Sequence, residues 1–494
     1  MASLDPNRFD EQKAAELQSP IEYYEAAEAR VRRKLDWNLM PLFFVLYMLA
    51  FLDRSNIGNA VLAGMTRDLH LVGDRYEWLL TIFYITYVVF EFSLLCWKNF
   101  PPHRVAAVVV FCWGVMATLQ SAVHNWSGLM ALRFFLGAFE AAYAPGVIYL
   151  LSFFYLRHEV GFRCGMFASA APLASTFAGA LAYGITSGHS SLSNWRLLFL
   201  VEGLPTILLA PIAFFLIPDS PDNARFLNVE EKAIAKSRAV RQTGKSERIG
   251  GVSLKELAQT LHDAKAWCYG LMYFSVNVSY ASLPVYLPTI LAKMGYSSIN
   301  AQGLSTPPYF AAYLFANITT FIADRTQQRG LVLITTSLVG GIGYIVLATV
   351  TTVGVRYFAV YLAAAGVFST IPNTLAWTLS WEINVDSNIL DNQGSDNRRG
   401  AGLVIINVIG QCGPILGTRL YPTAEGPRYV KGMSICAAFM FFAAVMAFAL
   451  RVLLVWENRK LDQRYNNKSG EGRETYRGAA VAVEDYGPKF RYVI

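Results

Sequence analysis

The chain has 494 residues, of which 54% are hydrophobic and 16% charged, with a formal net charge of +7 and a mean hydropathy of +0.34. One soluble core could not bury this much apolar surface, so the composition excludes an ordinary soluble globular protein. A bilayer core about 30 Å thick is crossed by a helix of roughly 20 mainly apolar residues, whose backbone polar groups are satisfied internally. The composition therefore predicts an all-α membrane protein.

The N-terminal segment, residues 1–36, is polar and charged and lacks the apolar core and small-residue cleavage site of a signal peptide. We expect it to be cytoplasmic, with the first membrane helix directing insertion. Twelve apolar stretches of spanning length follow this segment. They lie at 37–57, 78–97, 104–123, 128–156, 162–187, 196–217, 266–291, 304–324, 330–350, 355–381, 400–421 and 431–456.

Basic residues predict the orientation of these spans. Of the 42 Lys and Arg residues, six precede residue 37, nine lie in residues 219–265 and eight follow residue 456. They concentrate on alternate loops of the twelve-helix arrangement, and such loops are cytoplasmic in membrane proteins. We therefore expect both termini in the cytoplasm. The location that we expect, apart from this charge pattern, is the plasma membrane. The positive charge reflects topology, so no nucleic-acid partner is expected.

A polar segment at 218–265 divides the chain into two six-helix bundles, at 37–217 and 266–456. Parallel repeats of this kind pack around a central substrate path near the bilayer midplane. The pattern predicts a cytoplasmic linker that contains an amphipathic helix, because four apolar residues share roughly one helical face. They are Val252, Leu254, Leu257 and Leu261.

Two other polar segments are expected to lack regular structure. Residues 386–399 are rich in Asn, Asp and Gly and predict a flexible loop, and residues 457–494 predict a disordered cytoplasmic tail. The six cysteines have no spacing typical of disulfides or metal sites, so no metal or cofactor is expected. The chain also lacks motifs for a nucleophile with its base or for a phosphate-binding loop, which disfavours an enzyme.

Charged residues inside spans cost roughly 2.5–3.5 kcal/mol each on the insertion scale, so each indicates a functional site by default. Five stand out, namely Asp53, Arg54, Glu91, Arg133 and Glu140. Of these, Glu91 lies near the cytoplasmic end of its span, where a structural role is favoured over substrate contact.

Asp53 and Arg54 are adjacent in the first span and point about 100° apart on a helix. One of them can face the central path while the other meets a neighbouring helix. The alternative is a local ion pair near the helix end, where Arg reaches the interface. Only a cavity could hold both side chains inside the span, which favours a functional role.

Arg133 and Glu140 are seven residues apart in the fourth span, so they lie on nearly one face, about 10 Å apart along the helix axis. A buried carboxylate beside an arginine can bind and release a proton as the conformation changes, and proton coupling requires such a site. The alternative is that the two residues only hold helices together. Guanidinium groups pair well with carboxylates, so Arg54 and Arg133 predict an anionic substrate.

The second half offers uncharged polar residues within its spans. Asn277 and Tyr280 in the seventh span, with Asn407 and Gln411 in the eleventh, could hydrogen-bond a substrate. Each of them, taken alone, is also typical of a routine contact between membrane helices, worth under about 1 kcal/mol.

The loop sequence "ADRTQQRG" resembles a loop signature of the major facilitator superfamily, in which an acid and arginines at helix ends form a charge relay. Asp324, Arg325 and Arg329 match that signature, and we expect them to form a gating loop. The equivalent loop of the first half, "KNFPPHR", lacks the acid.

Four further stretches resemble the anion:cation symporter family of this superfamily, in its fungal branch of allantoate, nicotinate and pantothenate permeases. These stretches are "FLDRSNIGNA", "RFFLGAFEAAYAPGVIYLLSFFY", "WRLLFLVEG" and "RLYPTAEGPRYVKG". The resemblance implies that Asp53 and Glu140 bind protons. It also implies that Arg54 and Arg133 recognise the substrate anion.

The sequence thus predicts a monomeric, proton-coupled symporter that moves a small organic anion, such as a carboxylated vitamin or metabolite, by alternating access. Two alternatives remain open. An exporter of a fungal secondary metabolite could use the same fold with protons moving the opposite way. A non-transporting nutrient sensor would be expected to have a long signalling tail, and the predicted tail at 457–494 is short.

Overall fold

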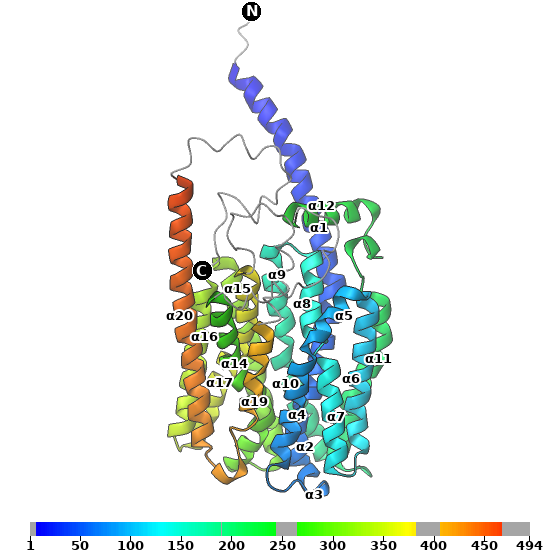
Figure 1. The fold of residues 1–494 in the computed structure, drawn as a ribbon, viewed down its shortest axis with the longest axis vertical. Helices are drawn as coiled ribbons and strands as arrows, with labels where there is room; N and C mark the ends of the chain where they lie inside the picture. Colours follow the sequence, from blue (N-terminus) through cyan, green and yellow to red (C-terminus); the bar gives the residue numbers. More distant parts are fainter. Residues whose placement is uncertain (1–5, 189, 244–263, 382–405, 467–494) are drawn as a thin grey trace, which may run out of the picture.

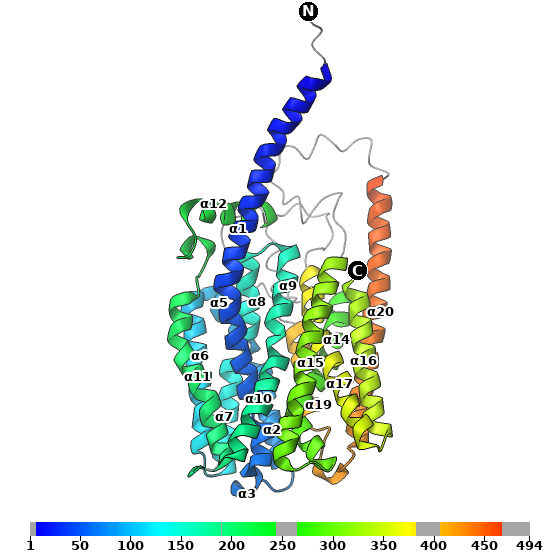
Figure 2. The ribbon, with the colours of Figure 1, turned by 180° about the vertical axis from the view of Figure 1, so that it is seen from behind.

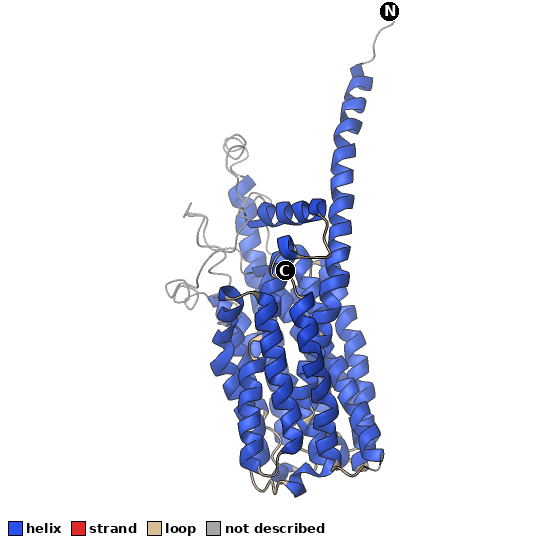
Figure 3. Cartoon of the chain, turned by 90° about the vertical axis from the view of Figure 1, so that its right-hand side faces the viewer, coloured by secondary structure: helices blue, strands red, loops and turns tan. Residues whose placement is uncertain are grey.

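The computed structural model describes residues 6–188, 190–243, 264–381 and 406–466 (Figure 1). Every regular element among these residues is helical, as the composition predicts (Figure 3). The amphipathic helix expected at 252–261 and the loop expected at 386–399 lie outside the described residues.

The first half consists of eight longer helices joined by short helical turns. The longer helices are α1 (Pro6–Ser55), α4 (Arg75–Val89), α6 (Pro102–Leu119), α7 (Trp126–Glu140), α8 (Tyr143–Phe154), α9 (Arg157–Ala168), α10 (Ala170–Ser187) and α11 (Asn194–Leu216). The short elements are α2 (Ile57–Ala60), η1 (Val61–Met65), α3 (Thr66–Asp68), η2 (Phe90–Ser93), α5 (Leu94–Asn99) and η3 (Gln120–Ala122).

The remaining helices form the linker and the second half. They include η4 (Pro221–Asn223), α12 (Val229–Thr243), α14 (Ala264–Lys293), α15 (Ser298–Thr326), α16 (Arg329–Thr349), α17 (Val353–Trp381), α19 (Gly413–Gly417), η5 (Thr423–Glu425) and α20 (Val430–Asn466). Residues 406–411 are helical as well. In Figures 1 and 2 the helices of the two halves stand side by side as two groups. The halves meet where α9 and α10 pack against α15 and α17.

Eight of the described helical segments are long and apolar enough to cross a membrane. They coincide with eight of the twelve expected spans. Two of the other four expected spans fall on α14 and α15. A third falls on α4 to α5, which the 3-10 turn η2 interrupts. The fourth is the span at 400–421, of which residues 400–405 are not described. α14 and α15 are long helices that each contain two prolines and several polar side chains, which lowers their hydropathy.

The outer surface of the bundle is apolar, unlike the surface of a soluble protein. Charged and polar side chains such as Asp53 and Arg133 are buried, while large apolar side chains cover the outside of the bundle. Examples of exposed apolar residues are Val108, Phe215, Ile318 and Val445. An apolar exterior with the charged side chains kept inside the bundle is the arrangement that a lipid bilayer favours.

Two helices extend beyond the expected span limits at the same end of the molecule. α1 is continuous from Pro6, and α20 runs to Asn466, while α12 lies across this end of the bundle (Figure 1). The tail predicted to be disordered from residue 457 is therefore helical in its first part. Arg, Lys, Gln and Leu in this stretch are good helix formers, so the helix continues after the apolar residues end.

Close packing of α4 against α7 depends on a glycine. A Cβ atom at Gly137 would collide with the Phe83 carbonyl oxygen and the Thr86 hydroxyl, so no larger residue allows this approach. Gly137 lies one turn before Glu140, and the contact therefore fixes the position of Glu140 relative to α4.

Candidate functional site

A cavity lies between the two halves and receives side chains from both. Its lining residues are Tyr47, Arg54, Tyr84, Tyr87, Ala144, Pro145, Ile148, Phe167 and Ala168 from the first half, and Tyr273, Asn277, Tyr280, Ala281, Ile371, Leu375, Asn407, Gln411 and Pro414 from the second. Arg54 is the one charged side chain among these described lining residues. The cavity is thus a polar, aromatic site with a single fixed positive charge.

Five of the six residues predicted to bind substrate line this cavity together. They are Arg54, Asn277, Tyr280, Asn407 and Gln411. The exception is Arg133, which is only 1% exposed and is not a lining residue. Its Nη1 donates to the backbone oxygen of Arg54 at 3.2 Å, so Arg133 supports the helix that carries Arg54.

The Arg54 guanidinium is held by a buried carboxylate and aromatic rings. Its Nε donates to Glu140 Oε1 at 3.0 Å, and Nη2 donates to the same oxygen. The rings of Tyr87 and Phe83 lie 5.0 and 5.3 Å from the guanidinium carbon. The other Glu140 oxygen has no hydrogen-bond partner among the described residues. α7 therefore presents a proton-accepting group directly behind the cationic group of the cavity.

Asp53 faces a different neighbour from Arg54, because adjacent positions on a helix point about 100° apart. Its Oδ2 accepts a hydrogen bond from Thr206 Oγ1 of α11 at 3.1 Å, and the side chain is buried outside the cavity lining. The two residues consequently do not form an ion pair with each other in this structure, because Arg54 pairs with Glu140 instead.

Sequence reasoning missed the tyrosines of the cavity. Tyr47, Tyr84, Tyr87 and Tyr273 line it in addition to Tyr280. The hydroxyls of Tyr47 and Tyr280 approach to 3.5 Å and join α1 to α14, which belong to different halves. The seven-residue interval from Tyr273 to Tyr280 places both on one face of α14, and this spacing could have indicated them.

Asn277 shows that one polar side chain can have two roles. It lines the cavity, and its Nδ2 donates to the Gly410 backbone oxygen at 3.2 Å. This is the interhelical contact considered as the alternative for the uncharged polar residues. The carbonyl oxygen of its amide is a hydrogen-bond acceptor at the cavity lining.

Two buried carboxyl groups lie outside the cavity lining. Glu91 is in the 3-10 turn η2, and Glu202 is in α11; all four of their carboxyl oxygens lack hydrogen-bond partners among the described residues. Glu202 belongs to the sixth expected span and could have been identified by the same criterion that selected Asp53 and Glu140.

Two of the three residues expected to form a gating loop are joined by an ion pair. Arg329 Nη2 donates to Asp324 Oδ1 at 3.0 Å, and the Arg329 guanidinium packs against Gly161 of α9, in the other half. Arg325 is exposed and has no ion pair among the described residues. Arg451 extends the cluster by donating to Gln328 Oε1 at 2.7 Å.

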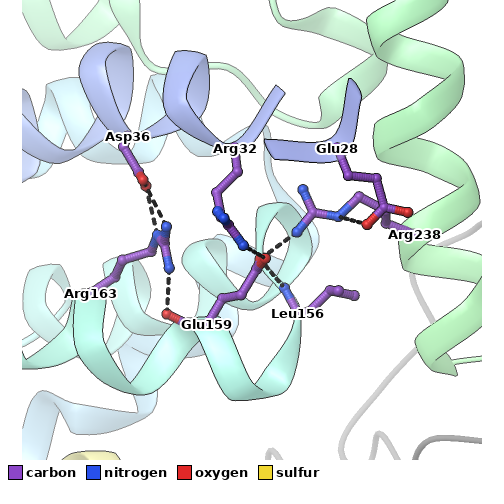
Figure 4. A network of polar contacts seen from close by, with 7 residues as sticks. All are labelled: Glu28, Arg32, Asp36, Leu156, Glu159, Arg163 and Arg238. Carbon is purple, nitrogen blue, oxygen red and sulfur yellow. Dashed lines mark hydrogen bonds and ion pairs between the residues drawn. The ribbon is translucent and has the colours of Figure 1, made fainter. Parts of the chain in front are cut away.

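A second polar cluster joins α1, α9 and the linker helix α12 (Figure 4). Glu159 accepts hydrogen bonds from Arg32 Nη1 at 3.1 Å, from Arg238 Nη2 and from the Leu156 backbone nitrogen at 3.1 Å. Glu159 falls between the fourth and fifth expected spans, so the search for charged residues within spans could not select it.

An adjacent ion pair in the same cluster is bidentate. Arg163 Nε and Nη2 donate to the two carboxylate oxygens of Asp36 at 2.6 and 2.7 Å (Figure 4). Together these contacts fix the N-terminal part of α1 and the linker helix on the first half.

Comparisons with known proteins place this fold in a family. The model of the Major Facilitator Superfamily matches residues 43–380. An uncharacterized transporter of Schizosaccharomyces pombe is 32% identical over 521 residues, which cover 100% of this chain and 98% of that protein. The high-affinity nicotinic acid transporter of Saccharomyces cerevisiae is 31% identical over 438 residues, covering 88% of this chain and 79% of that protein.

A solved structure agrees with this assignment at the level of the fold. The proton:xylose symporter XylE has a TM-score of 0.61 at 15% identity, covering 83% of this chain and 95% of that one. The helical bundle, the central cavity and the sequence relatives lead to one conclusion. The chain belongs to the Major Facilitator Superfamily and is a multi-pass membrane transporter, not an enzyme.

Proposed function

We propose that this transporter is a proton-coupled symporter of a small organic anion. The observation that carries the proposal is the ion pair between Arg54, which lines the cavity, and Glu140, which lies behind it. Transport of the anion and transport of the proton are coupled because the anion binds Arg54 and the proton binds Glu140 of the same ion pair.

The cavity lining supports an anionic substrate. Its one charged side chain among the described residues is the guanidinium of Arg54, which can donate to both oxygens of a carboxylate. Asn407, Gln411 and Tyr280 add neutral hydrogen-bonding groups from the second half. A substrate held between Arg54 and these residues contacts both halves, as alternating access requires.

The coupling follows from competition for Arg54. While Glu140 is ionised, it occupies the guanidinium that an anion would bind. A proton on Glu140 removes this negative charge and leaves Arg54 free to pair with the substrate. Proton and anion therefore bind together, and closure of one half against the other carries both across. Asp53 is a second proton-binding residue in this proposal, held by Thr206.

The relatives support the substrate class. The S. cerevisiae transporter carries nicotinic acid, a small aromatic carboxylic acid. A ring of this kind would meet Tyr47, Tyr84, Tyr87 and Tyr280 in the cavity, with its carboxylate at Arg54. We propose import across the plasma membrane by a monomer, with the ends of α1 and α20 and the helix α12 on the cytoplasmic side.

Uptake into cells tests this function. Cells expressing the protein are given a panel of radiolabelled organic anions, including nicotinate, at acidic and neutral external pH. Uptake of one anion that rises in acid, and that is lost in well-expressed Glu140→Gln, supports the proposal. If no panel anion enters at either pH while loaded cells lose one faster with the protein than without it, the transporter is an exporter. If the protein moves none in either direction, the sensor alternative is favoured.

A further inference from the structure

Glu202 is a buried carboxyl group in the middle of a membrane helix. Its side chain is 1% exposed, and neither carboxyl oxygen has a hydrogen-bond partner in the part of the chain that the structure describes. An ionised carboxylate without a partner is very costly in such surroundings, so the site favours the neutral form that holds a proton.

Asp53 lies next to this group. Glu202 and Thr206 are four residues apart on α11, so they share a face and are separated by about 6 Å along the axis. Thr206 Oγ1 donates to Asp53 Oδ2 at 3.1 Å, which places Asp53 one helical turn from Glu202. Asp53 is the charged residue that interacts electrostatically with Glu202, whereas Asp53 itself also interacts with Glu140 and Arg133.

The helix α6 packs against α11 beside Glu202, and its contacting residues there are uncharged. A side chain at Gly203 would collide with Thr118 of α6, and one at Gly114 of α6 would meet Thr206. Gly114 and Thr118 do not titrate, and Asp53 of α1 is the titratable group whose charge acts on Glu202.

Glu202 lies between Asp53 and one end of the bundle. α11 begins at Asn194, and Trp195 Nε1 donates to Asp68 Oδ2 at 2.8 Å, so this end of α11 is joined to the short helix α3. Glu202 is closer to this end than Thr206 is. A proton that enters from this end and reaches Asp53 along α11 passes Glu202 first.

We propose that Glu202 and Asp53 form a carboxyl pair that shares a proton, with Glu202 the member that exchanges it with the Asp68 end of the bundle. This inference rests on the proposed proton coupling and adds a residue to it. The proton leaves the Glu202 hydroxyl as Asp53 accepts it, and the Glu202 carboxylate then takes the next proton from water. The pair avoids two adjacent negative charges, because like charges in one site disfavour double ionisation.

The pH dependence of uptake distinguishes this role from a structural one. Glu202→Gln keeps the shape but cannot carry the proton or repel an ionised Asp53, so Asp53 holds its proton less tightly. The half-maximal point of uptake moves to lower pH by about one unit, a tenfold change in proton concentration. Glu202→Asp keeps the wild-type profile. Glu77→Gln, which removes a buried carboxyl group at the start of α4, leaves the half-maximal pH unchanged and serves as the matched control.

Infrared spectroscopy of the purified protein provides a readout that does not depend on transport. The carboxyl stretching band of a protonated side chain is lost in Glu202→Gln and titrates together with Asp53 in the wild type. If the band is lost in Glu202→Gln but wild-type uptake does not depend on pH, the carboxyl pair is supported and the proposed function is overturned. An unshifted half-maximal pH in Glu202→Gln, with wild-type uptake still stimulated by acid, overturns the inference alone.

Discussion

Arg54 and Glu140 form a buried ion pair between α1 and α7, with Arg54 Nε 3.0 Å from Glu140 Oε1. Arg54 also reaches the cavity between the halves, whereas Glu140 does not. The pair therefore connects a group that a solute can touch with a group that can accept a proton.

Replacing Glu140 by Gln should separate binding of the anion from binding of the proton. Gln keeps a hydrogen-bond acceptor for Arg54 but cannot exchange a proton, so uptake should fall by at least tenfold in acid and lose its dependence on pH. Exchange of labelled for unlabelled anion across the membrane, which requires no net proton movement, should fall less than uptake does. Equal loss of exchange and uptake would point to a purely structural defect.

Arg54→Lys should retain the positive charge but lose the planar fork that pairs with a carboxylate. We expect KM for the anion to rise by about tenfold in Arg54→Lys, since a bidentate pair is replaced by one hydrogen bond. Arg54→Ala should abolish uptake. KM and kcat are measured from initial uptake rates normalised to surface expression, and an unchanged KM in Arg54→Lys would contradict substrate contact at this residue.

Tyr47 and Tyr280 should be energetically coupled, because their hydroxyls meet at 3.5 Å across the two halves. Loss of one such hydrogen bond costs about 0.5–1.5 kcal/mol. Tyr47→Phe and Tyr280→Phe should each change KM by a few-fold, and the double variant should be no worse than the worse single one. A double-mutant cycle on KM measures this, and additive effects would show that the two hydroxyls act independently.

Glu159→Gln should destabilise the protein more than the loss of an exposed ion pair does. Arg238 is only 3% exposed and pairs with Glu159, so the variant leaves a buried cation without its main partner. We expect a loss of about 3–5 kcal/mol in the free energy of unfolding. Thermal unfolding of the purified protein in detergent measures the change.

A matched control for this experiment is Lys236→Gln. Lys236 pairs with Asp222 at 3.6 Å, and both side chains are at least half exposed. Such pairs contribute about 0–1 kcal/mol, so the melting temperature should hardly move. If Glu159→Gln has the same melting temperature as this control, the cluster of Figure 4 does not hold the linker helix on the first half.

The helical membrane fold could be predicted because it depends on local properties of the sequence. Span length and hydropathy are set within each stretch of about 20 residues, and each expected span falls largely on helices among the described residues. α14 and α15 were recognised as spans even though their prolines and polar residues lower their hydropathy. The extension of α20 past the apolar residues is not predicted from its charged sequence, although these residues favour helix.

The site was predicted less completely, since contacts between helices are not local. The angle between Asp53 and Arg54 correctly indicated that they face different neighbours, but it could not show that Arg54 pairs with Glu140. Arg133 and Glu140 share a helix face, yet Arg133 contacts the Arg54 backbone and lies behind the cavity. The register between α1 and α7 decides this, and no pattern within either helix encodes it.

Proton movement in proteoliposomes that contain only the purified protein tests the central claim most directly. A pH-sensitive dye reports the external pH when the anion identified by uptake is added to vesicles without a pre-formed gradient. The account predicts that the anion makes the outside more alkaline in wild-type vesicles and leaves it unchanged with Glu140→Gln. Anion entry at the wild-type rate without any change in external pH would contradict proton-coupled symport.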